Sequence, residues 1–361
     1  MRRDIGTDDP RVRVRPQSSS RPRTKNRPDW SQKPLGQVIA IDRGRYSVIC
    51  QGTGNRILAV RARELGRGSV IMGDFVRLTG DLSGRPDTLG RIVAVEDRRN
   101  VLRRSLEDAP DQRGEKAIVA HADLMVIVTA LADPPPRTGM IDRCLVAAYE
   151  AGMGAILCLT KADLGDPDEL RRLYADFDVD IVVTSCGSAD MVPAGIDDVR
   201  RLLAGRFSVL VGHSGVGKST LINALVPQAG RAVGHVNEVT GRGRHTSTSS
   251  EAFELPEGGW IVDTPGVRSF GLGHVSVEDV LGVFPDAAQA TTWCLPLCTH
   301  LDSEPSCALD SWKQAVGPFA VSSVLTEAEK ASRSHLVVSV RRLLEAVIHA
   351  QTISHVSRSR T

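Results

Sequence analysis

The sequence predicts an α/β protein in which a small all-β barrel precedes a mainly parallel sheet with helices on both faces, and a mainly helical segment follows. Short alternating strands with glycine turns run to about residue 105, strand and helix patterns then alternate to about residue 272, and a cysteine cluster with helical patterns comes last. We therefore expect a tail over residues 1–33, the barrel over 34–105, the sheet domain over 106–277 and the helical domain over 278–361.

The composition is that of an ordinary globular protein, with 41% hydrophobic and 24% charged residues in a chain of 361. No apolar run reaches the length needed to cross a membrane, and no apolar segment follows the charged N-terminus as it does in a secretory signal. We expect a cytoplasmic protein without a membrane partner, and we expect it to be a monomer.

Charge is divided unevenly along the chain. Residues 1–105 hold 23 Lys and Arg against 11 Asp and Glu, a balance of +12, while the remainder holds 22 against 32, a balance of −10. A basic front favours contact with a polyanion, and RNA fits better than a membrane because the front has no amphipathic basic helix. An Arg-rich solvated surface is the alternative. Residues 1–33 lack a periodic apolar pattern and are predicted to be a disordered basic tail.

Apolar and polar residues alternate in the segments "GQVIAIDRGRYSVIC", "NRILAVRAR", "SVIMGDFVRLTG" and "LGRIVAVEDR". This pattern predicts a small antiparallel barrel of about five strands, and the OB-fold, which often binds RNA, is the natural candidate. An SH3-like or other small barrel without a role in RNA binding is the alternative. Aromatic side chains suited to base stacking are few (Tyr46 and Phe75), so we expect RNA contacts here to involve the backbone and its shape.

Strand and helix patterns alternate from about residue 117 to residue 272, which implies a mainly parallel sheet covered on both faces. The predicted strands are "ADLMVIVTAL", "GAILCLTKAD", "DIVVTSC", "FSVLVGHSG" and "GWIVDTPG". The predicted helices are "MIDRCLVAAYEAG", "PDELRRLYADF", "IDDVRRLLAG" and "KSTLINALV". Beyond residue 278, "SSVLTEAEKASR" and "HLVVSVRRLLEAVIHA" give two further helical patterns.

The segment "GHSGVGKS" lies between a predicted strand and a predicted helix, the context that a phosphate-binding loop of the form G-x-x-x-x-G-K-[ST] requires. Its glycines let backbone N–H groups turn toward phosphates, and the helix N-terminus adds positive potential. Lys218 is expected to reach the β- and γ-phosphates, and the Ser219 hydroxyl to coordinate Mg²⁺. The residues predicted to surround the phosphates are Gly212, His213, Ser214, Gly215, Val216, Gly217, Lys218, Ser219 and Thr220.

One strand further on, "WIVDTPG" places Asp263 at a strand end, where its carboxylate could hold the magnesium shell. The N–H group of Gly266 could then sense the γ-phosphate. A D-x-x-G sequence is weak evidence by itself, but its place after a phosphate-binding loop makes it specific.

A guanine-reading motif of the form [NT]-K-x-D occurs at "TKAD", upstream of the phosphate-binding loop. Its Asp would accept two hydrogen bonds from the base, and a residue at the next strand end would offer a backbone contact to the guanine oxygen. The predicted base-binding residues are Thr160, Lys161, Ala162, Asp163 and Ser185. This order is that of a circularly permuted GTPase. Such a permutation costs little because the sheet keeps all its strands. Thr160 replaces the commoner Asn, so we expect weaker bracing of the base loops and a modest affinity for GTP.

Three of the seven cysteines crowd together in "CLPLCTHLDSEPSC". With one histidine they form a Cys₃His set, suited to one tetrahedral Zn²⁺ in a closed structural site. The predicted ligands are Cys294, Cys298, His300 and Cys307. The remaining cysteines are predicted to be buried or inert thiols; they are Cys50, Cys144, Cys158 and Cys186.

Together, the permuted order, "DTPGVRSFGL", "GRGRHTSTSS", the basic barrel in front and the Cys/His cluster behind resemble the ribosome small-subunit-dependent GTPase family (RsgA), over about residues 35–350. The resemblance implies a GTPase that assists late maturation of the small (30S) ribosomal subunit, binds its 16S rRNA and is stimulated by that particle. It implies GTP and GDP with Mg²⁺, and one structural Zn²⁺. The spacing of the ligands departs from the usual family pattern, with three residues in place of four between the first two cysteines, and six in place of five before the last.

The segment "GRGRHTSTSS" lies where a switch loop is expected, and a disordered surface loop is the alternative. Thr246 or Thr248 is the predicted contact to Mg²⁺ and the γ-phosphate, with Thr246 preferred. Val267 stands where many GTPases have a Gln that orients water, an apolar replacement that the family shares. His245 is the nearest candidate in the sequence to orient water instead.

Two other functions are compatible with parts of the sequence. One is an RNA-binding assembly scaffold with a mainly structural nucleotide site, which the intact Lys218, Ser219 and Asp263 disfavour. The other is an ATP-dependent kinase, which "TKAD" disfavours because that motif reads guanine.

Overall fold

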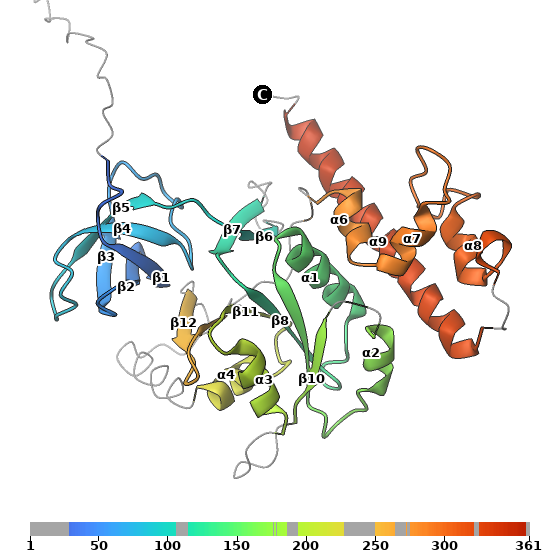
Figure 1. Cartoon of the computed structure of the whole chain (residues 1–361), viewed down its shortest axis with the longest axis horizontal. Coiled ribbons are helices and arrows are strands. Elements are labelled where there is room, and N and C mark those ends of the chain that lie inside the picture. Colours follow the sequence, from blue (N-terminus) through green and yellow to red (C-terminus); the bar gives the residue numbers. More distant parts are fainter. Residues whose placement is uncertain are drawn as a thin grey trace, which may run out of the picture. The chain divides into compact units, whose positions relative to one another are not determined.

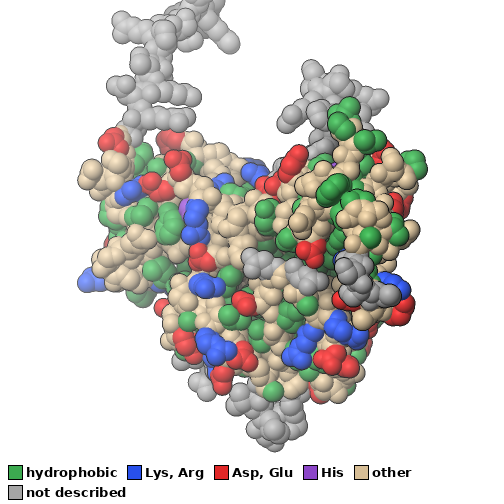
Figure 2. Space-filling model, turned by 45° about the vertical axis from the view of Figure 1, so that its right-hand side comes forward, with side chains coloured by type: hydrophobic (Ala, Val, Ile, Leu, Met, Phe, Trp, Pro, Cys, Tyr) green, Lys and Arg blue, Asp and Glu red, His purple; other side chains and the backbone are tan. Residues whose placement is uncertain are grey.

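The computed structural model describes residues 29–105, 115–175, 177, 179–185, 194–226, 250–263, 272, 275–320 and 325–358. Within these ranges, no helix combines the length and the apolar character that a membrane crossing requires. Lys and Arg side chains are interspersed with Asp and Glu over the face drawn in Figure 2.

The first five strands close into a barrel (Figure 1). They are β1 (Leu35–Asp42), β2 (Arg45–Cys50), β3 (Arg56–Arg61), β4 (Phe75–Gly80) and β5 (Gly90–Val95). β1 pairs with β2 and β4, β2 pairs with β3, and β5 pairs with β3 and β4, so the ring is complete. The β3–β5 pairing is parallel, which corrects the predicted antiparallel barrel. A closed ring with an odd number of strands cannot alternate in direction throughout.

Six later strands form the predicted α/β sheet, in the order β10-β9-β8-β11-β13-β12. They are β8 (Leu124–Ala130), β9 (Gly154–Thr160), β10 (Asp180–Val183), β11 (Phe207–Val211), β12 (Ser250–Glu254) and β13 (Trp260–Asp263). All neighbours are parallel except β12, which is antiparallel to β13. The sequence analysis did not predict β12. Its other edge pairs with β1, with Ala40 opposite Glu251, so a continuous ladder joins the barrel to the sheet.

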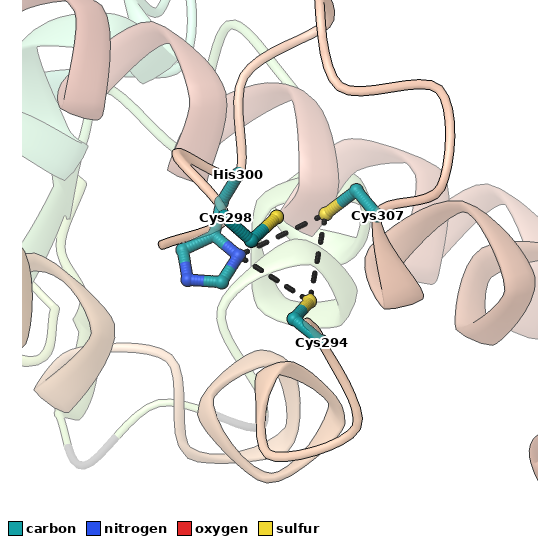
Figure 3. A group of neighbouring side chains, drawn as sticks. All are labelled: Cys294, Cys298, His300 and Cys307. Atoms are coloured by element: carbon teal, nitrogen blue, oxygen red, sulfur yellow. Dashed lines mark hydrogen bonds between the residues drawn. The ribbon is translucent and has the colours of Figure 1, made fainter. Parts of the chain in front are cut away.

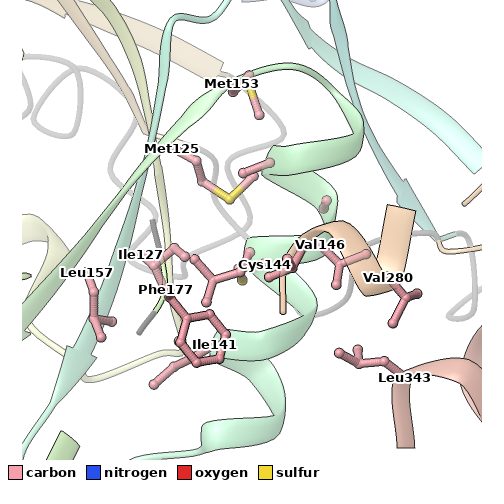
Figure 4. Packing of buried hydrophobic residues seen from close by; sticks show 14 of the residues in the cluster. Met125, Ile127, Ile141, Cys144, Val146, Met153, Leu157, Phe177, Val280 and Leu343 are labelled. Atoms are coloured by element: carbon pink, nitrogen blue, oxygen red, sulfur yellow. The ribbon is translucent and has the colours of Figure 1, made fainter. Parts of the chain in front are cut away.

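Helices cover both faces of this sheet, as the alternation of patterns predicted. They are α1 (Thr138–Glu150), α2 (Asp168–Leu173), α3 (Ile196–Leu203) and α4 (Lys218–Leu225). α1 packs on the face that carries Met125 and Ile127, and its Ile141 is fully buried there (Figure 4). α3 and α4 pack on the opposite face, which carries Val126 and Val128. Successive residues of β8 are therefore buried on both sides, as expected for a central parallel strand.

A two-stranded sheet that the sequence did not predict lies between the barrel and β8 in the chain. Its strands are β6 (Val101–Ser105) and β7 (Glu115–Ala120), which pair antiparallel. Two adjacent arginines, just before β6, connect this part of the chain to the barrel and to the sheet. Arg98 makes two bonds, of 2.6 and 2.8 Å, with the fully buried Asp74 of the barrel. Arg99 pairs at 2.6 Å with Asp123, the residue before β8.

The chain after the sheet is helical. Its elements are α6 (Val277–Gly282), α7 (Pro285–Thr291), α8 (Ala308–Gln314), the 3₁₀ turn η1 (Gly317–Phe319) and α9 (Glu327–Arg358). The two helical patterns predicted here merge into the single 32-residue α9, because no Gly or Pro interrupts it.

A buried carboxylate fastens α9 to α1. Asp142 of α1 is fully buried and accepts hydrogen bonds from the Tyr174 hydroxyl at 2.7 Å and the Ser339 hydroxyl at 2.8 Å. It also pairs with Arg342 of α9. This cluster compensates the buried charge with a cation and two donors, the arrangement that a carboxylate away from water requires.

Candidate functional site

The segments predicted to bind a nucleotide lie at one edge of the sheet. β9 ends at Thr160, β11 at Val211 and β13 at Asp263. β11 lies next to β13, and only β8 separates it from β9. Because these strands are parallel, their carboxyl ends share the edge at which open α/β sheets bind ligands. Motifs from distant parts of the chain therefore converge there.

The predicted phosphate-binding loop joins β11 to α4. Gly212 has a φ of +155°, and a Cβ on it would lie 2.4 Å from the carbonyl oxygen of Val128. Gly217 has a φ of +94°, in the left-handed region that favours glycine. Val216 is buried in the core beneath α3 and α4, which anchors the loop.

Lys218 and Asp263 form the charged centre of this edge. Lys218 Nζ donates hydrogen bonds to the carbonyl oxygens of Gly212 and His213, at 2.7 and 2.8 Å. Burial lowers the pKa of Lys218, and the charge of Asp263 opposes that shift. Burial raises the pKa of Asp263, and the charge of Lys218 opposes that shift in turn. Lys218 and Asp263 therefore interact electrostatically in a partly desolvated site.

Asp263 suits a divalent cation. Its Oδ1 is buried and has no hydrogen-bond partner among the described residues. An unpaired buried oxygen is costly, and carboxylate oxygens are ligands that Mg²⁺ prefers. Ser219, the other predicted ligand, is the second residue of α4 and is exposed, as is Thr220 after it. The exposed Ser214 and Gly215 complete the rim of the loop.

The predicted guanine reader contacts the phosphate-binding loop directly. Thr160 Oγ1 donates a hydrogen bond of 2.6 Å to the carbonyl oxygen of Val216, and a longer one of 3.3 Å to that of Thr129. Lys161, with a φ of +59°, donates from Nζ to the carbonyl oxygen of Asp133. The expectation of weaker bracing did not consider the threonine hydroxyl, which braces the loop itself.

The outer part of the base-binding region lies on neighbouring strands. The Ala162 N–H group donates to the carbonyl oxygen of Thr184 at 3.2 Å, which ties the loop after β9 to the end of β10. Asp163 is exposed, and Ser185 forms an isolated bridge with Ala194. The two residues predicted to face the base therefore follow adjacent strands.

Several predicted residues lie outside the part of the chain that the structure describes. They are His245, Thr246 and Thr248 of the expected switch loop, Gly266 and Val267 after Asp263, and the thiol Cys186. Their roles stay predictions.

Sequence reasoning missed a cation beside the phosphate-binding loop. Arg137, just before α1, places Nη1 2.7 Å from Nε2 of His213. No motif pointed to Arg137. The signal available was its position, because the loop after β8 lies at the same sheet edge as the loop after β11.

The cysteine and histidine cluster has the spacing of a tetrahedral metal site (Figure 3). The Sγ atoms of Cys294 and Cys307 lie 3.9 Å apart, and Nδ1 of His300 lies 3.5 and 3.8 Å from them. With Cys298, all four ligand atoms lie within 4.8 Å of one another. Zn–S bonds of about 2.3 Å at tetrahedral angles would place two sulfur atoms about 3.8 Å apart. The cluster therefore suits a metal ion in a closed site.

This metal site lies between helices of the C-terminal part. Cys294 follows α7, and Cys307 is the residue before α8. Arg341 of α9 donates to the carbonyl oxygen of His300 at 3.2 Å and to Asp310 of α8 at 2.7 Å. Burial raises the pKa of the Cys307 thiol to about 12, so a cation that binds there must displace a proton. A bound metal would connect α7 to α8 and, through Arg341, to α9.

A parallel sheet with a predicted phosphate-binding loop, preceded in the chain by the predicted guanine-reading motif, defines the fold as that of a circularly permuted P-loop GTPase. Comparison with known proteins agrees with this class. Residues 95–273 match the family described as RsgA GTPase. A protein of Pseudomonas syringae pv. tomato, named small ribosomal subunit biogenesis GTPase RsgA, is 42% identical over 229 residues, which are 61% of this chain and 64% of that protein. The match thus covers less than two thirds of that relative's length.

A protein of the same name from Ectopseudomonas mendocina is 40% identical over 242 residues, which are 64% of this chain and 68% of that protein. The crystal structure of YjeQ from Thermotoga maritima has a TM-score of 0.57 at 26% identity, covering 85% of this chain and 98% of its own. YloQ, described as a circularly permuted GTPase, has a TM-score of 0.57 over 86% of this chain and 96% of its own; at 22% identity this likeness concerns the fold alone. The chain belongs to the RsgA GTPase family.

Proposed function

We propose that this protein is a GTP hydrolase that assists late maturation of the small (30S) ribosomal subunit. It converts GTP to GDP and phosphate, and contact with the subunit and its 16S rRNA stimulates the reaction. The name that its relatives share, small ribosomal subunit biogenesis GTPase RsgA, supports a role in maturation of the small subunit. The observation that carries the proposal is the hydrogen bond from Thr160 to Val216, which joins the base-reading loop to the phosphate-binding loop.

In this proposal, each end of the nucleotide is held by a different loop. Asp163 accepts hydrogen bonds from the N1–H and 2-amino groups of guanine. Lys218 and the first N–H groups of α4 bind the β- and γ-phosphates. Asp263 and Ser219 would hold one magnesium ion, which would supply positive charge beside those phosphates.

The residues outside the described part of the chain complete the proposed site. Thr246 and Gly266 contact the γ-phosphate, and His245 orients the attacking water because Val267 cannot. Without a Gln at that position, hydrolysis by the protein alone should be slow.

The other two parts serve binding and stability in this proposal. Residues 34–105 contain 13 Arg and no Lys, against 7 Asp and Glu, so the barrel offers guanidinium groups to RNA phosphates. The Cys₃His cluster holds one structural Zn²⁺, the usual metal for this ligand set.

Single-turnover hydrolysis of GTP and of ATP, with and without purified small subunits, tests the proposal. We expect hydrolysis of GTP only, accelerated by the subunits and lost in Lys218→Ala. Lys116→Ala is the matched control, because Lys116 is exposed on β7 and lies outside every motif. Equal hydrolysis of ATP would contradict the guanine assignment. An absence of stimulation would instead favour a scaffold whose nucleotide site is structural.

A further inference from the structure

A cleft of about 360 Å³ lies at the edge of the sheet opposite the proposed nucleotide site. Gln37 of β1 and Phe75 of β4 line it from the barrel. Phe207 and Trp260, the first residues of β11 and β13, line it from the sheet. Because these two strands are parallel, their first residues lie at the amino edge, and the phosphate-binding loop and Asp263 lie at the carboxyl edge.

One positive charge in the cleft has no partner among the residues that the structure describes. Arg99 and Asp123 both line it, and they neutralise each other through their 2.6 Å ion pair. Arg206 also lines it and is exposed. The Arg206 guanidinium has no hydrogen bond or ion pair with any other residue that the structure describes, so it is available to an anion.

The aromatic side chains around the cleft come from both parts of the chain. Of the two barrel aromatics, Tyr46 is buried in the barrel core, whereas Phe75 reaches the cleft, where its ring meets that of His121 edge-on at 4.8 Å. Trp260 is only partly buried and presents part of its indole ring. Aromatic side chains from both parts of the chain therefore border the cleft.

The wall that carries Trp260 and Arg206 is fixed by backbone bonds. The Trp260 N–H group donates to the carbonyl oxygen of Arg206 at 2.8 Å, and that of Gly205 donates to Gly258 at 2.9 Å. Gly259 has a φ of +92°, and a Cβ there would lie 2.6 Å from the backbone nitrogen of Arg206. The backbone positions from which the Trp260 and Arg206 side chains extend are therefore fixed before any ligand arrives.

A polar group is positioned to read the edge of a base. Gln37 Nε2 donates to the carbonyl oxygen of Gly73 at 3.4 Å, which orients the side-chain amide. Its Oε1 has no donor in the described part of the chain and can accept a hydrogen bond. Adenine, cytosine and guanine carry an exocyclic amino group that could donate to it, whereas uracil offers only its ring N3–H group.

We propose that this cleft takes one unpaired nucleotide of an RNA strand, with the base on Trp260, its edge on Gln37 and its phosphate on Arg206. Unpaired RNA bases are commonly recognised by aromatic stacking and by hydrogen bonds to their edges. The volume lies near the lower end of the roughly 300–1,000 Å³ typical of small-ligand sites, which suits one nucleotide and excludes a duplex. The inference rests on the proposed function, because the small subunit would supply the RNA.

Fluorescence anisotropy of a labelled adenosine hexanucleotide with the full chain tests this site. Trp260→Ala should weaken binding by about 5- to 150-fold, the range expected for the loss of one stacked base. Arg206→Gln should lower the slope of log K against log salt by about 0.7, the value for one phosphate contact on a single strand. Arg171→Gln, which removes an exposed arginine from α2 of the sheet domain, is the matched control and should have little effect. A uridine hexanucleotide should bind more weakly than the adenosine one.

Two further measurements keep the result interpretable. GTP hydrolysis without subunits should be unchanged in the cleft variants, because the proposed nucleotide site is at the other edge of the sheet. If the wild-type protein did not hydrolyse GTP, the proposed function would be refuted, but the RNA measurement would remain valid. Arg206→Gln alters only an exposed side chain, so it decides the question even if Trp260→Ala does not fold. Wild-type RNA affinity and salt slope in Arg206→Gln, or an equal loss in Arg171→Gln, would overturn the inference. Binding of free AMP as tight as that of the hexanucleotide would also overturn it, in favour of a mononucleotide site.

Discussion

The hydroxyl of Thr160 donates a 2.6 Å hydrogen bond to the carbonyl oxygen of Val216, across 56 residues of sequence. A Cβ on Gly217 would lie 3.6 Å from the same hydroxyl, so the end of β9 and the phosphate-binding loop are in close contact. Two loops proposed to hold opposite ends of a nucleotide are thus fixed relative to each other. Such pre-organisation lowers the ordering cost of binding.

Thr160→Val should therefore weaken GTP binding. The substitution keeps the branched shape but removes the donor, which leaves the buried carbonyl oxygen of Val216 unpaired at a cost of about 1–3 kcal/mol. If that cost disfavours mainly the arrangement in which the two loops are aligned for binding, the dissociation constant for GTP should rise by about 5- to 150-fold. Equilibrium binding of a fluorescent GTP analogue measures this, and Thr160→Ser, which keeps a hydroxyl, should stay close to wild type. Unchanged affinity in the valine variant would show that the brace does not contribute to binding.

Asp163→Asn should redirect the site from GTP toward xanthosine triphosphate. The carboxylate complements the two donors of guanine, whereas an amide complements the additional carbonyl group of xanthine. Asp163 is exposed, so the fold should tolerate the change. Competition binding with both nucleotides is the measurement. Retained preference for GTP would mean that "TKAD" does not read the base.

Removing the metal should loosen the C-terminal helices and spare the nucleotide site. Cys298→Ser, or a chelator, should raise hydrogen exchange in α7 and α8, because the cluster lies between them. Amides of β8 and β11 should keep their protection. Added Zn²⁺ should reverse the effect of the chelator but not that of the substitution. Native protein that contains no zinc would contradict the assignment of the metal.

Neutralising exposed arginines of the barrel should reduce stimulation by the small subunit without changing the basal rate of GTP hydrolysis. A combined Arg43→Gln, Arg45→Gln and Arg85→Gln variant removes three phosphate-binding charges from exposed positions. Arg201→Gln, on α3 of the sheet domain, is the control. Stimulation of the wild type should fall as salt rises, and more steeply than that of the triple variant.

Deletion of the whole barrel would be a poorer experiment. Ile39 and Met72 of the barrel region belong to the same buried cluster as the core of the sheet, so removing them would expose apolar surface.

Full stimulation of the triple variant by the small subunit would contradict the role of the barrel arginines. Recognition of the subunit would then lie in the sheet domain or the metal-binding part.

The sequence predicted the α/β sheet and the nucleotide motifs because both are local signals. A phosphate-binding loop is recognisable between a strand and a helix, and buried parallel strands are nearly continuous apolar runs. The strand β12, with the sequence "SEAFE", has neither an apolar run nor strict alternation, and only its partners on both sides make it a strand. The cleft was not predictable for a similar reason. Phe75 and Trp260 belong to different parts of the chain, and no motif links them.

Glu251 of β12 is opposite Ala40 of the barrel on one side and opposite Asp263, the proposed magnesium ligand, on the other. The barrel is therefore not an interchangeable module. In a chimera that takes its barrel from another member of the family, the transplanted first strand would have to pair with β12 in the same register. A slip of one residue turns the side chains of a strand to the opposite face. Such a chimera could keep every nucleotide-binding motif and still misplace the carboxylate at the end of β13.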